Sequence, residues 1–234
     1  MHPGDHPTRA GRARGRTAAV IPARNEAATI GAVVFAALDA GRVDEVLVVD
    51  NASTDTTAGV AAAHGARVVH ERTPGKGEAM RAGVAATRAD VIVFLDADLV
   101  GLRPDHVDRL VAAVADGHAD MACGLFDRGP VANAIFLEGL PVLTGQRALR
   151  RAVFDQLDLA DVRGYRVEAA LNSLVARRGL ARHDQVLDGL WHRTKEEKLA
   201  SPVLGHAAKL GMLVVACWSY LRFAVARRTL EPAR

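Results

Sequence analysis

Cysteine is nearly absent from this sequence, and lysine is scarce. Only Cys123 and Cys217 occur among 234 residues, and their wide separation excludes a disulfide scaffold and fits no metal-ligand spacing. We expect both to be free thiols in a reducing compartment. Hydrophobic residues make up 50% of the chain, which excludes an intrinsically disordered protein. Because no internal repeat or interdomain linker is visible, a chain of this length predicts one sizeable domain.

A basic folded region is also lacking, although the chain carries a net charge of +3. Residues 1–16 hold four arginines against Asp5, whereas residues 17–234 hold 26 basic and 26 acidic side chains. We therefore expect no nucleic-acid partner. Residues 1–16 are rich in glycine, proline and arginine and predict a disordered, solvated tail. A weak contact of this tail with an anionic lipid or another polyanion is the alternative.

Long hydrophobic runs are missing as well. The first apolar run begins at Thr17 and is broken by Pro22, which is too short for a secretory signal. Leu210–Leu221 is free of charge for twelve residues, short of the roughly 20 that span a bilayer. Residues 201–234 predict an apolar and basic helix. Three roles stay open for it: a helix packed in the core or at a homodimer interface, an interfacial membrane helix, and a true membrane span. We expect a cytoplasmic protein, peripheral on the inner face of the plasma membrane if that helix is interfacial.

Short apolar runs alternate with helical stretches through the first hundred residues. We expect strands over 18–21, 45–50, 67–70 and 91–95, and helices over 26–40, from the polar turn 51–57 to about 64, and over 77–87. This alternation predicts an α/β domain with a mostly parallel sheet flanked by helices. Parallel sheets bind ligands beyond the carboxyl ends of their strands, which directs attention to residues 22–25, 50–54 and 96–98.

The second half of the sequence is less regular. We expect helices over 104–116, 146–154 and 165–177, and strands over 119–126, 142–144 and 184–190. Residues 129–140 fit neither pattern clearly.

The strongest local feature is Asp96-Ala97-Asp98, which directly follows a buried apolar strand. Two carboxylates at positions i and i+2 of a strand exit can converge on one cation and on a ligand hydroxyl. Carboxylate oxygens suit Mg²⁺ or Mn²⁺, and such metals usually also bind substrate phosphates. The motif therefore predicts a metal–phosphate site at this edge of the sheet.

Other polar residues follow the same edge. Asp50 ends the second strand, and the Ser53, Thr54 and Asp55 that follow it are good helix N-caps. Lys76 lies in a glycine-rich loop that lacks the Walker A pattern but places a cation near a bound phosphate. His192 follows an alternating segment and is a candidate further metal ligand.

Four motifs together resemble the family 2-type glycosyltransferases of the GT-A fold. They are Val20-Ile21-Pro22-Ala23-Arg24-Asn25-Glu26, Val48-Val49-Asp50-Asn51-Ala52-Ser53-Thr54-Asp55, Pro74-Gly75-Lys76-Gly77-Glu78-Ala79 and Phe94-Leu95-Asp96-Ala97-Asp98-Leu99. The glycine-rich motif, Gly164-Tyr165-Arg166-Val167-Glu168 and His192 are most similar to the glucosyl-3-phosphoglycerate synthases. The Asp-Ala-Asp-Leu segment is also similar to dolichyl/polyprenyl-phosphate sugar synthases. The resemblance covers roughly residues 17–195 and implies a GT-A domain over 17–200.

The resemblance also implies roles for individual residues. The donor, a UDP- or GDP-linked sugar, would contact Pro22, Ala23, Asn25, Glu26, Asp50, Asn51, Lys76, Asp96 and Ala97. Asp98 would ligate the Mg²⁺ or Mn²⁺ that bridges the diphosphate, with His192 as the second protein ligand. Thr144, Gly145 and Arg147 would face a phosphate- or hydroxyl-bearing acceptor, such as phosphoglycerate or polyprenyl phosphate. Glu168 would be the general base of an inverting reaction, or would only orient the sugar in a retaining one.

Two further classes stay open at this point. A sugar-nucleotide-forming nucleotidyltransferase also has a parallel sheet and a metal-binding aspartate, but Pro22-Ala23-Arg24-Asn25-Glu26 stands where its glycine-rich start is expected. The second class is a non-catalytic binding module on the same scaffold. The polar residues expected at a catalytic site argue against it, since all are present: Lys76, Asp96, Asp98 and His192.

Overall fold

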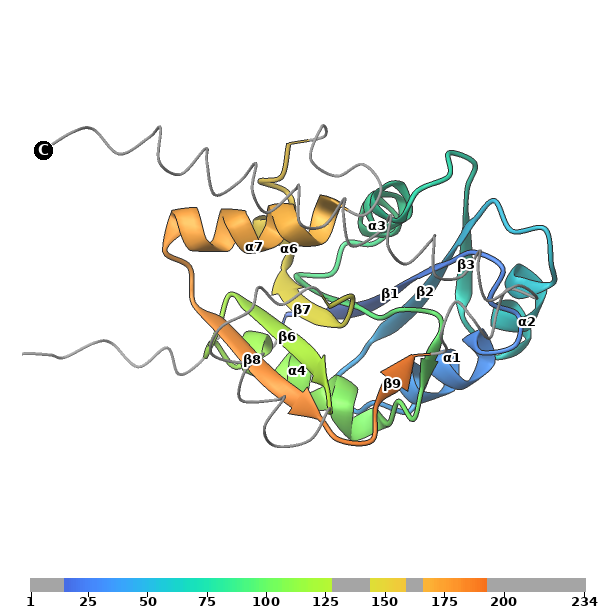
Figure 1. Ribbon diagram of the computed structural model, residues 1–234, viewed down its shortest axis with the longest axis horizontal. Coiled ribbons are helices and arrows are strands. Elements are labelled where there is room, and N and C mark those ends of the chain that lie inside the picture. The colour runs from blue at the N-terminus through green and yellow to red at the C-terminus, as the bar shows by residue number, and fades with distance from the viewer. Residues whose placement is uncertain (1–14, 128–143, 159–165, 193–234) are drawn as a thin grey trace, which may run out of the picture.

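The chain folds into a seven-stranded sheet with helices on both faces (Figure 1), as seen in a computed structural model that describes residues 15–127, 144–158 and 166–192. The strands of this sheet are β1 (Thr17–Ala23), β2 (Glu45–Asn51), β3 (Arg67–Glu71), β4 (Val91–Phe94), β6 (Met121–Phe126), β7 (Arg147–Arg150) and β8 (Arg182–Leu187). The helices are α1 (Ile30–Leu38), α2 (Thr57–Ala63), α3 (Lys76–Ala85), α4 (Pro104–Ala115), α6 (Arg151–Phe154) and α7 (Val167–Arg178). A separate two-stranded ladder joins β5 (Leu99–Val100) and β9 (Trp191–His192).

The strand order of the large sheet is β3-β2-β1-β4-β7-β6-β8. Strands β1 to β4 pair in parallel, and so do β6 and β8, whereas β7 runs antiparallel to both of its neighbours. The predicted α/β fold with a mostly parallel sheet is therefore confirmed. Because β1, β2 and β4 run the same way, their carboxyl ends meet at one edge of the sheet.

Two apolar cores lie on opposite faces of the sheet. Side chains of consecutive strand residues point to opposite faces, so Val91 and Val93 of β4 join the core under α1 and α4, whereas Ile92 and Phe94 join the core under α3 and α7. Burying one such side chain contributes roughly 1.5–3 kcal/mol to the stability of the fold. This burial on both faces is what holds the polar strand ends in fixed positions.

The first hundred residues match the expected elements closely, and in the second half α4, β6 and α7 do so as well, but one segment differs. Gln146–Phe154 was expected to be one helix, but Arg147–Arg150 forms the strand β7, and only Arg151–Phe154 is helical. The reason is tertiary: Ala148 and Leu149 are fully buried between β4 and β6, and this pairing outweighs helix propensity. The ladder of β5 and β9 was not expected at all.

Several predicted segments lie outside the described residues. They are most of the basic tail 1–16, the ambiguous residues 129–140, most of the strand 142–144 and the helix 201–234. Arg16 is described, and its backbone amide donates to the Asp90 carboxylate at 3.0 Å. Within the described ranges, every helix is too short or too polar to cross a bilayer.

Candidate active site

The loops after β1 and β2 are fastened to each other at the carboxyl edge of the sheet. The Asn25 amide donates to the Ser53 hydroxyl at 3.1 Å, and the Asn25 side-chain oxygen accepts from the Thr54 amide at 2.8 Å. Asn25 and Ala52 have φ angles of +57° and +55°, in a backbone region that residues other than glycine rarely adopt. Backbone strain of this kind concentrates at binding sites.

The expected helix caps after β2 have a different role from the one predicted. Ser53 and Thr54 bond to Asn25 instead of capping α2, whose N-cap is Thr56. Asp55 does accept from the Thr57 amide at 3.0 Å, and the Thr57 hydroxyl in turn accepts from the Glu26 amide at 2.8 Å. The polar turn is therefore used to join the first two loops, because both carry parts of the same site.

Asp50, at the end of β2, is almost fully buried. One of its carboxylate oxygens lies 3.2 Å from His70 Nδ1, whereas Oδ1 is buried with no hydrogen-bond partner in the described structure. A buried carboxylate oxygen without a partner is costly, and a bound donor group would remove that cost. Asp50 is paired across the strands with Ala23, and Pro22 directly precedes Ala23. Three residues that were predicted to contact the nucleotide-sugar donor therefore lie side by side.

Asn51 braces the loop that leads to Lys76. Its amide nitrogen donates to the carbonyl oxygens of Glu71 and Thr73 at 3.2 and 2.7 Å, and its amide oxygen accepts from the Gly75 amide at 2.7 Å. The side chain was expected to line the nucleotide base pocket. In the structure it instead fixes the backbone from which the Lys76 side chain extends.

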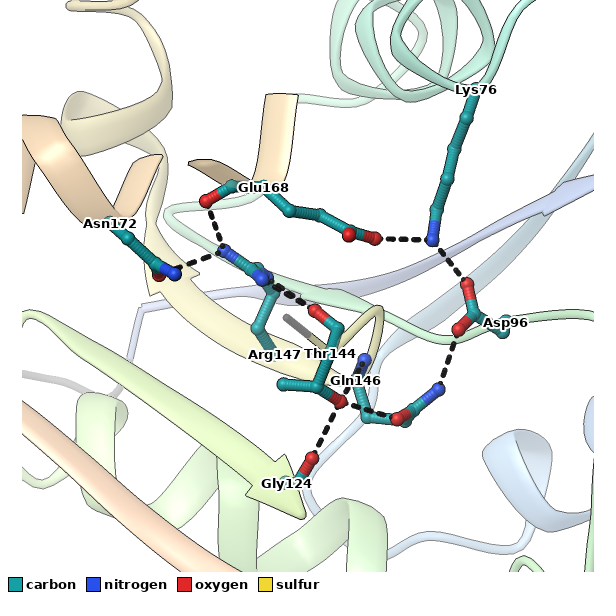
Figure 2. A network of polar contacts seen from close by, with 8 residues as sticks. All are labelled: Lys76, Asp96, Gly124, Thr144, Gln146, Arg147, Glu168 and Asn172. Carbon is teal, nitrogen blue, oxygen red and sulfur yellow. Dashed lines mark hydrogen bonds and ion pairs between the residues drawn. The ribbon is translucent and has the colours of Figure 1, made fainter. Parts of the chain in front are cut away.

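Lys76 lies at the centre of the site and joins two carboxylates from distant parts of the chain (Figure 2). Its Nζ lies 2.6 Å from Asp96 Oδ1, just past β4, and 2.5 Å from Glu168 Oε1, on α7. Burial alone would lower the pKa of Lys76, but the charges of Asp96 and Glu168 outweigh it and raise the pKa above its ordinary value. Burial would likewise raise the pKa of Asp96, and Lys76 lowers it instead. The lysine and Asp96 therefore stay charged together at neutral pH.

Gln146 holds the other oxygen of Asp96. Its amide nitrogen donates to Asp96 Oδ2 at 2.8 Å, and its amide oxygen lies 2.6 Å from the Thr144 hydroxyl, which also approaches the Gly124 carbonyl (Figure 2). Gly145 packs directly on the Asp96 carboxylate, so closely that a Cβ at this position would overlap it. Asp96 is thus fixed on three sides, which orients its carboxylate.

Arg147 does not face an acceptor, which corrects the sequence-based expectation. Its side chain is fully buried, and the guanidinium donates to the carbonyl oxygens of Thr144 and Glu168 and to the Asn172 side chain (Figure 2). The Thr144 hydroxyl is likewise bonded inside the protein. Both groups therefore support the site from inside the protein: Arg147 connects the segment after residue 143 to the start of α7, and the Thr144 hydroxyl connects it to β6.

The β5–β9 ladder brings His192 beside Asp98. His192 is the strand partner of Leu99, the residue that follows Asp98, and its ring packs at a tilt against that of Phe126 with ring centres 5.0 Å apart. Ala97, which lies between the two aspartates in the sequence, is buried. A carboxylate and an imidazole suit Mn²⁺, and their oxygen and nitrogen donors leave most coordination positions for phosphate oxygens. Among the described residues no cluster of three or more metal-ligating side chains is found.

Sequence reasoning missed Asn172 and Gly124 as parts of the site, and it gave no role to Gln146, which lies in the segment expected to face the acceptor. Gln146 and Arg147 are polar residues next to the buried pair Ala148 and Leu149, and polar side chains beside a buried strand are a usable signal. It was overlooked because the segment was assigned to a helix. Asn172 and Gly124 carried no signal, since only the fold brings them near Arg147 and Thr144.

The sequence profile of the family "Glycosyl transferase family 2" matches residues 18–158. The glucosyl-3-phosphoglycerate synthase of Mycobacterium tuberculosis is 39% identical over 144 residues, which cover 57% of this chain and 44% of that protein. An uncharacterised glycosyltransferase of Mycobacterium bovis is 45% identical over 114 residues, which cover 49% of each chain. The chain therefore spans about half the length of the curated relatives that it matches.

Solved structures of the Mycobacterium tuberculosis glucosyl-3-phosphoglycerate synthase share the fold. The complex with Mn²⁺ and UDP-glucose has a TM-score of 0.64 and 32% identity, covering 82% of this chain and 77% of that one. The complex with Mn²⁺, UDP and glucosyl-3-phosphoglycerate has a TM-score of 0.69 and 28% identity, covering 94% of this chain and 82% of that one. The likeness therefore extends beyond the first hundred residues.

Proposed function

The chain belongs to glycosyl transferase family 2, and we propose that it transfers glucose from UDP-glucose to a phosphate- or hydroxyl-bearing acceptor with the help of Mn²⁺ or Mg²⁺. One observation carries this proposal: Lys76 joins Asp96 and Glu168 at the edge of the sheet where the β5–β9 ladder places His192 beside Asp98. Neither alternative suggested by the sequence, a nucleotidyltransferase or a non-catalytic module, is favoured by a contact in this site.

The nucleoside would bind over the joined loops after β1 and β2. Pro22, Ala23, Asn25 and Glu26 form one side, and Asp50 offers its unpartnered carboxylate oxygen from the other. A hydrogen bond from the base or ribose to that oxygen would replace the water that Asp50 loses on burial. The strained backbone at Asn25 and Ala52 supports a preformed site, because such strain persists only where the surroundings hold it.

Asp98 and His192 would hold the divalent metal together with the donor diphosphate. When bound, the metal neutralises charge on the departing diphosphate. Asp96 is better suited to sugar hydroxyls than to the metal, because Lys76 and Gln146 already bond both of its oxygens. Glu168 reaches the same space from α7 and would orient the sugar, with Lys76 as the cation between the two carboxylates.

The acceptor would approach the sugar from the side of α7 and of the residues after Thr144. Phosphoglycerate is our first candidate, because the related synthase was solved with glucosyl-3-phosphoglycerate. Polyprenyl phosphate is the second, and it would suit a membrane-facing helix in residues 201–234, which lie outside the described residues. We also propose peripheral membrane contact and a homodimer, both through the helix expected in residues 201–234. A cytoplasmic location is proposed because the two cysteines suit a reducing compartment.

A direct transfer assay tests this function. The protein is incubated with UDP-glucose and Mn²⁺, with phosphoglycerate in one arm and polyprenyl phosphate in the other, and products are identified by mass spectrometry. Glucosylated phosphoglycerate supports the proposal as stated, and a glucosylated lipid phosphate supports the second acceptor. Release of pyrophosphate from UTP and glucose phosphate, with no transfer in either arm, would contradict the function.

A further inference from the structure

A cluster of charged side chains outside the proposed active site fastens the turn between β8 and β9 to the start of α4. Asp188 lies in that turn, and its Oδ2 and Oδ1 accept from Arg103 Nη2 at 3.0 Å and from Arg109 Nη2 at 3.2 Å. The backbone carbonyl of Asp188 accepts from Arg103 Nη1 at 3.0 Å as well. Two arginines thus hold one aspartate by both its side chain and its backbone.

A buried histidine lies behind this cluster. His106 is fully buried in the first turn of α4, and its Nδ1 accepts from the Arg103 amide at 3.3 Å. Burial lowers the pKa of His106, so the ring is neutral, and we assign its proton to Nε2, which lies 3.7 Å from Asp188 Oδ1, too far for a hydrogen bond. Hydrogen bonds from Arg103 hold the pKa of Asp188 at about 2, so the aspartate stays ionised at neutral pH.

The backbone is closely fitted at the same place. Gly101, with a φ of +77°, lies so close to the Gly189 carbonyl oxygen that a Cβ would overlap it. Leu190 follows, fully buried, and its amide closes the turn on the Leu187 carbonyl at 3.2 Å. The turn therefore directs the chain from β8 into β9 along a defined path.

The described part of β9 needs such a support. It consists of Trp191 and His192, and it pairs only with Val100 and Leu99 of β5. A two-stranded ladder of this length is not stable in water without help. The fastening at Asp188 lies four residues before His192, where it can supply that help.

We propose that Asp188, held by Arg103 and Arg109, is a positioning residue that keeps β9 on β5 and thereby keeps the His192 imidazole beside Asp98. This inference rests on the proposed function, because it needs His192 to ligate the metal. Exposed ion pairs contribute little to global stability. The expected effect of losing Asp188 is therefore on the geometry of the metal site and not on the folding of the domain.

The first test measures the position of β9 without any ligand. Trp191 is half exposed, and Trp218 is the only other tryptophan, so a Trp218→Phe background reports on Trp191 alone. In this background we expect Asp188→Asn to increase acrylamide quenching of Trp191 at least about twofold. The matched control is Asp184→Asn, which removes a two-bonded pair with Arg182 on the same strand β8 and should leave quenching unchanged. Equal quenching of Trp191 with and without Asp188→Asn in the Trp218→Phe background would overturn the proposal.

The second test measures Mn²⁺ binding in the presence of UDP by electron paramagnetic resonance of the free ion. Loss of a residue that orients a metal ligand typically costs about 10- to 100-fold in metal affinity. We expect about tenfold weaker Mn²⁺ binding in Asp188→Asn, recovery in Asp188→Glu, and unchanged UDP binding without metal. Unchanged Mn²⁺ affinity in Asp188→Asn would overturn the proposal.

His192→Ala separates this inference from the proposed function. If His192→Ala weakens Mn²⁺ binding and Asp188→Asn does not, the positioning role is wrong and the metal site stands. If His192→Ala also leaves Mn²⁺ binding unchanged, the proposed metal site itself is wrong, and the positioning role is overturned with it.

Discussion

The two halves of the described domain are built by different rules. In residues 17–100, β1, β2 and β3 lie side by side, each is followed by a helix, and β4 pairs with β1. In residues 101–192, β7 lies between β4 and β6, and β8 lies beyond β6 at the edge of the sheet. Strand β9 is not part of this sheet and pairs with β5. The first half is a regular parallel unit, and the second half is assembled around it by pairings between distant segments.

This difference separates the parts of the candidate site. The first half supplies Asp50, Asp96 and Asp98 at or near strand ends and Lys76 at the start of α3, where the parallel fold alone would place them. The second half supplies Gln146, Glu168 and His192, which reach the same edge only through tertiary contacts. We conclude that the first half provides most of the charged side chains of the site, and that the second half orients these side chains.

The largest effect is expected from removing the metal-binding carboxylate of the first half. Asp98→Ala should lower glucose transfer at least about 10³-fold, because one of only two proposed protein ligands is lost. The thermal unfolding midpoint should stay within a few degrees of the wild type. Asp39→Ala, an exposed aspartate at the end of α1, is the matched control and should retain full activity. Transfer by Asp98→Ala within threefold of the wild type would refute the metal assignment.

The next effect comes from the cation that joins the two halves. Lys76→Met leaves Asp96 and Glu168 facing each other without compensation, which should cost about 3–5 kcal/mol in the free energy of unfolding. The value of kcat/KM for transfer should fall about 100-fold. Urea denaturation and initial rates measure the two effects.

A double variant shows whether the ion pair is the cause. Adding Glu168→Gln to Lys76→Met removes one of the uncompensated charges and should restore part of the lost stability. If the two losses in stability simply add, Lys76 and Glu168 are not coupled and the contact between the halves is unimportant.

A smaller effect is expected from Glu168 alone. Lys76 holds Glu168 Oε1 at 2.5 Å, which favours the role of orienting the sugar over that of a general base. Glu168→Gln should therefore raise the KM for UDP-glucose about tenfold and lower kcat less than that. A loss of 100-fold or more in kcat, within the range of general-base catalysis, would instead assign proton abstraction to Glu168.

The smallest effect concerns pH. The pKa of Lys76 is raised, so its contribution to stability is complete below its ordinary pKa and is lost only at strongly alkaline pH. The pKa of Asp96 is lowered, so its contribution is complete above its ordinary pKa and is lost as the pH falls below about 4. The stability difference between wild type and the triple variant Lys76→Met, Asp96→Asn, Glu168→Gln, which keeps none of the three charges, should therefore stay constant between about pH 5 and 9. A steady change within this range, measured by urea denaturation, would show that the pair titrates near neutrality.

The same division explains what the sequence could reveal. Strands β1, β2 and β4 were predictable because each is a short run that contains buried β-branched residues, as in Glu45–Asn51. The strand Arg147–Arg150 was not, because only its two neighbours in the sheet make it extended. In the site, Lys76 and Asp96 were recognisable from local motifs, whereas the inward direction of Arg147 depends on contacts with Glu168 and Asn172.

The central claim is that residues from both halves form one metal-dependent donor site. Isothermal titration of UDP-glucose into the protein, with and without Mn²⁺, tests it most directly. We predict one binding site per chain and an affinity at least about tenfold higher with Mn²⁺, accompanied by roughly 2.7 kcal/mol of added stability at 100 times the dissociation constant. Absence of binding, or equal affinity with and without Mn²⁺, would contradict the account.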